Sequence, residues 1–175
     1  MRRLALLLLA AACGLSACDT GSILDENVVL TKTRTVTFSY ACNARASGQS
    51  LSVNATTTID FTGQLDGFRA ADVVSARVTD VRLRRLLPTT TPEKLGELMR
   101  DLRLVLVGSG GGTVVDAATL PAATSVTLTP MSTDLAALVR AGAFQPRLDF
   151  TVVGTQNTEC KMDAEMTFRI ELPGV

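Results

Sequence analysis

The chain has 175 residues, with 17 basic and 17 acidic side chains and no histidine or tryptophan. This length predicts a single domain, and the balanced charge argues against the basic surface of a nucleic-acid-binding protein. The absence of histidine excludes Ser-His-Asp and Cys-His catalytic arrangements and every histidine-containing metal site. The sequence therefore predicts a non-enzymatic protein with no metal site and no cofactor.

The N-terminus has the pattern of a secretory signal peptide. Two arginines follow the initial methionine, and the next nine residues carry no charge. This apolar run is too short to span a bilayer, which takes about 20 residues. The sequence Leu15-Ser16-Ala17-Cys18 that follows resembles the lipobox of bacterial lipoproteins. The resemblance covers only the first 18 residues.

The lipobox resemblance implies cleavage before Cys18 and acylation, including palmitate, of its thiol and new amino group. Residues 1–17 are then the signal peptide, 18–27 a tether, and 28–175 one domain. The expected location is the bacterial cell envelope, facing the periplasm or another extracytoplasmic space and anchored to a membrane through Cys18. Asp19 favours the inner membrane in enterobacterial lipoproteins but not in other groups, so both membranes stay open. The alternative is an ordinary cleaved signal peptide.

Alternation of apolar and polar residues predicts strands in the first half of the domain. The first two are expected over 28–42 and 51–61, separated by a turn over 43–49. A third strand over 72–87 changes phase, with Val74, Ala76 and Val78 inward before Val81 and Leu83. One extra residue explains this change, so we predict a β-bulge at Thr79 and Asp80.

The second half combines strands with two short helices. We expect a helix starting at Thr91-Pro92, a hairpin of 102–107 and 113–118 around a glycine-rich turn, and a strand over 125–128. A helix capped by Ser132 or Thr133, a strand over 147–153 and a regularly alternating last strand over 160–172 follow. The fold class is all-β: an antiparallel β-sandwich with immunoglobulin-like rhythm and one or two short helices. A flattened β-barrel is the alternative.

Two cysteines remain once Cys13 of the signal peptide and Cys18 of the lipobox are set aside. Cys42 ends the first strand and Cys160 begins the last, both on the apolar side of the alternation. If these strands are antiparallel neighbours, the cysteines meet and form a structural disulfide in an oxidising compartment. Two buried free thiols are the alternative.

The strongest basic cluster contains Arg77, Arg82, Arg84 and Arg85. We identify Arg82, Arg84 and Arg85 as possible contacts to an anionic partner, with Arg82 and Arg84 on one strand face. The alternative is a solvated sheet edge whose charges prevent strand pairing with other chains.

These features predict a lipid-anchored envelope protein that serves as an interaction or assembly module with an envelope protein partner. One alternative is a carrier of lipid or another hydrophobic ligand, with three methionines lining its cavity: Met131, Met162 and Met166. A less favoured alternative is a glycan hydrolase that uses only carboxylates. The candidate carboxylates are Asp60, Asp66, Asp72, Asp80 and Asp149.

Overall fold

The computed structural model describes residues 29–42, 46–61, 65, 67–87, 94–153 and 160–174, with only the backbone of Cys42, Leu87 and Cys160. The expected signal peptide and tether, together with Cys18, lie outside these residues. So do Asp66 and the expected helix start at Thr91-Pro92.

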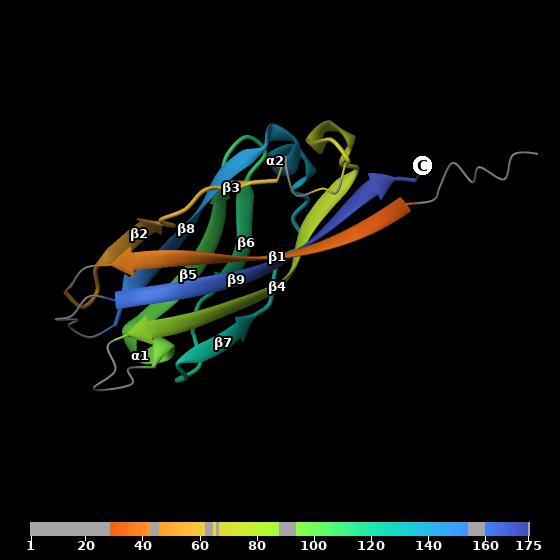
Figure 1. Ribbon diagram of the computed structural model, residues 1–175. Coiled ribbons are helices and arrows are strands. Elements are labelled where there is room, and N and C mark those ends of the chain that lie inside the picture. Colours follow the sequence, from red (N-terminus) through yellow and green to blue (C-terminus); the bar gives the residue numbers. More distant parts are fainter. Residues whose placement is uncertain are drawn as a thin grey trace, which may run out of the picture.

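Two antiparallel sheets pack face to face (Figure 1). Sheet A has the order β1 (Val29–Cys42), β9 (Cys160–Pro173), β4 (Ser75–Leu87), β7 (Ser125–Leu128). Sheet B has the order β2 (Ser50–Asn54), β8 (Ala143–Val152), β5 (Met99–Val107), β6 (Gly112–Ala117), and β3 (Ile59–Asp60) also pairs with β8. The helices are short: α1 (Leu95–Leu98), α2 (Ala136–Ala141) and a 3-10 turn (Ala70–Asp72). The predicted all-β sandwich is confirmed, and the described strands form no closed barrel.

The first and last strands are neighbours over their whole length. An unshifted antiparallel ladder runs from Val29 opposite Pro173 to Cys42 opposite Cys160. The other side of β9 pairs with β4, where the register shifts between Val78 and Asp80. This shift confirms the predicted bulge and leaves apolar side chains buried on both sides of Thr79. The bulge also sets which β4 residues face outward.

The predicted second strand is wrong in its middle. Residues 55–58 interrupt the strand: Ala55 N–H still donates to Pro146 O of β8 at 2.7 Å, but Thr56 N–H donates to Ser39 O at 2.9 Å. Ser39 belongs to β1 of sheet A, so Thr56 touches the other sheet before β3 pairs with β8 again. Val74 was expected to face inward but precedes β4 and is 52% exposed. Alternation alone does not reveal where a strand is interrupted.

The predicted short helices are present, but α2 begins later in the chain than predicted. α1 is a single turn, and α2 begins only at Ala136. Thr133 does not cap α2, because its hydroxyl donates to Thr113 O at 2.9 Å. The Asp134 carboxylate instead accepts the Ala136 N–H at 3.0 Å.

The inner faces of both sheets form one continuous apolar core. Three rings join the layers near its centre: Phe168 of β9 lies 5.2 Å from Phe61 and 6.0 Å from Phe144 of β8, measured between ring centroids. Met162 and Met166 are 1% and 0% exposed in the same core. Side chains therefore fill the space between the sheets, and the polar residues of sheet A face outward.

Candidate functional site

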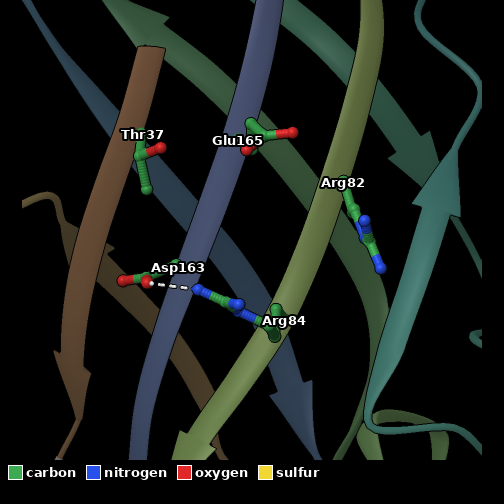
Figure 2. Close-up of a pocket in the computed structure, with 5 residues that line it drawn as sticks. All are labelled: Thr37, Arg82, Arg84, Asp163 and Glu165. Atoms are coloured by element: carbon green, nitrogen blue, oxygen red, sulfur yellow. Dashed lines mark hydrogen bonds and ion pairs between the residues drawn. The ribbon is translucent and has the colours of Figure 1, made fainter. Parts of the chain in front are cut away.

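The outer face of sheet A carries a shallow depression that crosses three strands. Its lining residues, which we call the charged face, are Thr37 of β1, Asp163 and Glu165 of β9, and Arg82 and Arg84 of β4 (Figure 2). Strand register brings them together, because Glu165 is opposite both Thr37 and Arg82, and Asp163 is opposite Arg84. Residues distant in sequence thus form adjacent rows on one flat surface.

Asp163 connects two neighbouring strands on this surface. Its Oδ1 accepts a hydrogen bond from the Ser39 hydroxyl at 2.7 Å, and its Oδ2 lies 3.4 Å from Nη2 of Arg84. The Asp163 side chain is 13% exposed, whereas that of Arg84 is 58% exposed. The long contact and the exposure leave the Arg84 guanidinium accessible to another anion.

Arg82 is held differently from Arg84. Its Nε donates to Ser125 Oγ at 3.0 Å, which turns the guanidinium toward β7 and away from Glu165 (Figure 2). In the described part of the chain, no carboxylate lies within ion-pair distance of Arg82. Glu165 is exposed and likewise has no ion-pair partner among the described residues. Arg82 and Glu165 therefore leave one cation and one anion open to a partner.

Arg85 does not join the charged face. Arg82 and Arg84 are exposed on the outer side of β4, whereas Arg85 is half-buried and pairs in register with Met162, a core residue. Successive side chains of a strand point to opposite faces, so Arg85 belongs to the inner side. The structure thus brings together two of the three predicted arginines.

A second depression lies on the outer face of sheet B, and its carboxylates are neutralised by arginines. Arg103 Nε lies 3.2 Å from Asp116, and Arg147 Nη2 lies 2.8 Å from Asp149. Desolvation opposes the ionisation of Asp149, but hydrogen bonds from Arg147 and Ser52 and the charges of Arg147 and Arg103 outweigh it and lower the pKa of the carboxyl. The surroundings of Asp149 thus favour its ionised form.

The other predicted site residues are dispersed. Asp60 and Asp80 are exposed, and Asp72 forms an ion pair with Arg69 at 3.1 Å. Met131 is 46% exposed, whereas Met162 and Met166 are buried. Within the described ranges, no group of acidic or cysteine side chains is arranged to hold a metal ion, and no helix has the length and apolarity to cross a bilayer.

Sequence reasoning missed Thr37, Asp163 and Glu165 as members of the site. The outward parity of Asp163 and Glu165 was readable from the alternation of the last strand. Their partners were not readable, because they depend on the order β1-β9-β4 and on the bulge at Thr79.

The comparisons with known proteins found structural similarity without a family. No family model matches the chain, and no curated protein does. A chain of the infectious bursal disease virus Gx strain is 13% identical with a TM-score of 0.43; the match covers 83% of this chain and 32% of the viral one. The BFDV capsid protein is 8% identical with a TM-score of 0.40, and the match covers 83% and 99%. FLHE is 18% identical with a TM-score of 0.25, and the match covers 84% and 97%. The chain thus spans about a third of the length of the bursal disease virus chain.

Proposed function

We propose that this protein is a lipid-anchored component of the bacterial cell envelope that binds an envelope protein partner through the charged face of sheet A. The observation that carries the binding proposal is the pair Arg82 and Arg84, which project from adjacent outward positions of β4 with exposed guanidinium groups. Charged groups of this kind favour a partner surface that presents acidic side chains.

The position of the charged face supports a protein partner rather than lipid headgroups. The expected tether enters the domain at the start of β1. Thr37 lies eight residues further along the strand, which corresponds to about 26 Å at 3.3 Å per residue. A domain standing upright on its tether would hold this face well away from the bilayer. A protein of the same envelope can reach it there.

The filled interior supports a binding module over a ligand carrier. Displacing Phe61, Phe144 or Phe168 would break the aromatic contacts between the two layers. A glycan hydrolase needs one carboxyl with a raised pKa as its acid, and Asp149 is not that acid, because its pKa is lowered. The polar outer face is the surface left for recognition.

The anchor is tested on its own by mass spectrometry of the protein isolated from bacterial membranes. The proposal predicts that the mature chain starts at Cys18 and carries acyl chains, and that Cys18→Ser releases the protein from the membrane fraction. A mature chain that starts elsewhere, or an unmodified Cys18, would overturn the anchor. Neither result depends on the charged face.

The binding surface is tested by chemical cross-linking in intact cells, affinity purification and mass spectrometry. We expect the wild-type protein to recover one envelope protein in stoichiometric amount. The double variant Arg82→Ala plus Arg84→Ala should no longer recover it. Arg103→Ala is the matched control, because Arg103 is also exposed and paired with an aspartate but lies on sheet B. Equal recovery with the double variant, or loss with the control alone, would reject the charged face as the contact.

A further inference from the structure

We infer that Cys42 and Cys160 form a disulfide bond that covalently joins the first and last strands of the domain. The two residues are backbone partners at the final position of the β1–β9 ladder. The ladder contains no register shift along its length, so the placement of this last pair follows from all the pairs before it.

The backbone spacing of such a pair suits a disulfide. Directly opposed residues in antiparallel strands have Cα atoms about 4.5 or 5.5 Å apart, depending on the hydrogen-bonding position. Both values fall within the range of about 4.4–6.8 Å seen across disulfides. Opposed residues also share one face of the sheet, here the face on which Tyr40 and Met162 are buried.

The inventory of thiols leaves no competing pairing within the proposed mature chain. The sequence contains four cysteines, of which Cys13 and Cys18 belong to the leader and its cleavage site. Acylation of Cys18 removes its thiol from exchange chemistry, which leaves Cys42 and Cys160 for each other.

The location of the pair gives the bond a structural effect. Among the described strands, β1 lies at the edge of sheet A and pairs along its length with β9 alone. Ser39 O provides one further tie, because it accepts hydrogen bonds from Thr56. A bond at the Cys42 end of β1 prevents this edge strand from separating from β9. It also closes a loop of about 118 residues, which restricts the unfolded chain strongly.

The reaction is a thiol–disulfide exchange with the disulfide of a thiol oxidase or of oxidised glutathione. One cysteine, as thiolate, attacks the oxidant disulfide and releases one thiol of the oxidant. The second cysteine then attacks the mixed disulfide and releases the other. The pair loses two electrons and two protons in total, and the oxidant disulfide becomes two thiols.

Peptide mapping tests the inference directly. The full chain is isolated under non-reducing conditions, with free thiols blocked by alkylation, and is digested with trypsin. We expect peptide 35–45 to be linked to peptide 148–161 and to separate on reduction. Alkylated Cys42 and Cys160 in the unreduced sample, or either cysteine joined to glutathione or to a second chain, would overturn the inference.

Two variants separate this bond from other contributions. Cys42→Ser and Cys160→Ser should each expose one reactive thiol and lower the melting temperature of the oxidised protein by roughly 10 °C, as expected for a long loop. Reduction should lower the wild-type melting temperature equally and leave both variants unchanged. A reductant effect on the variants as large as on the wild type would contradict the bond. Oxidation of the purified protein in a glutathione buffer tests the pair independently of the anchor at Cys18.

Discussion

Oδ1 of Asp134 accepts a hydrogen bond from the backbone N–H of Ala76 at 3.2 Å and so ties the start of α2 to the edge of β4. The same atom accepts the N–H of Ala136 at 3.0 Å, and the neighbouring Leu135 N–H donates to Ala76 O at 2.6 Å. β7 pairs with β4 only from Val81 to Arg84, so this segment satisfies backbone groups on the β4 edge beyond the reach of β7.

Replacing this carboxylate should destabilise the fold. We expect Asp134→Ala to lower the free energy of unfolding by about 1 kcal/mol, because the N–H groups of Ala76 and Ala136 lose their acceptor. Urea denaturation at pH 7 measures the difference. Asp116→Ala is the control, because Asp116 lies on an exposed face and forms only a surface ion pair with Arg103. A smaller loss for Asp134→Ala than for Asp116→Ala would contradict the assigned role.

The same carboxylate predicts a pH dependence. Hydrogen bonds from the backbone of Ala136 and Ala76, opposed by slight desolvation and aided by the charges of Arg140 and Arg77, lower the pKa of Asp134. Its stabilisation is therefore fully present above the unfolded pKa of about 3.9 and is lost as the pH falls through the lower folded value. The stability difference between wild type and Asp134→Asn should shrink between pH 5 and pH 2. A difference that grows in acid would refute this assignment.

Phe168 should be the most sensitive position of the three-ring cluster, because it contacts both other rings from the opposite sheet. Its side chain is fully buried. We expect Phe168→Ala to cost about 3–5 kcal/mol through lost contacts and a cavity. Val107→Ala, at a position 43% exposed, should stay within about 0.5 kcal/mol. Denaturant unfolding compares the two variants. A smaller loss of unfolding free energy for Phe168→Ala than for the control Val107→Ala would show that the rings do not hold the layers together.

Tyr40, the single tyrosine, should respond to alkali in a distinctive way. Burial raises the pKa of its phenol well above the ordinary value. Tyr40 therefore stabilises the fold fully below about pH 10, the pKa of an exposed tyrosine. Above that value the phenol ionises readily only in the unfolded chain, so the free energy of unfolding declines. Phenolate absorbance should appear together with unfolding. Ionisation in a fully folded protein near pH 10 would contradict the burial of this side chain.

Removing the Tyr40 hydroxyl should not weaken the fold. The oxygen is buried and has no hydrogen-bond partner among the described residues. We expect Tyr40→Phe to leave stability unchanged or raise it by up to about 1 kcal/mol, since an unsatisfied polar group is removed. Tyr40→Phe should also reduce the loss of stability in alkali. A clearly lower free energy of unfolding for Tyr40→Phe in urea would show that the hydroxyl has a hydrogen-bond partner.

The alternation in the sequence predicted which side chains of a strand face the core, but it did not predict which strands are neighbours. The alternation in β9 and the phase change at Thr79 are local, so both were readable from the residues themselves. The interruption of the second strand at Thr56 depends on the carbonyl group of Ser39, which belongs to a different strand. The charged face shows the same division, because Arg82 and Arg84 were identified from one strand while Asp163 and Glu165 required the sheet order.

The most direct test of the proposed binding role is site-specific photo-cross-linking in intact cells. A photoreactive amino acid replaces Thr37, which is exposed on the β1 side of the charged face, or Ser52, which is exposed on the outer face of sheet B. We predict a single protein adduct from position 37 that disappears when Arg82 and Arg84 are changed to alanine, and no such adduct from position 52. No adduct at position 37, or the same adduct from both faces, would contradict the proposal.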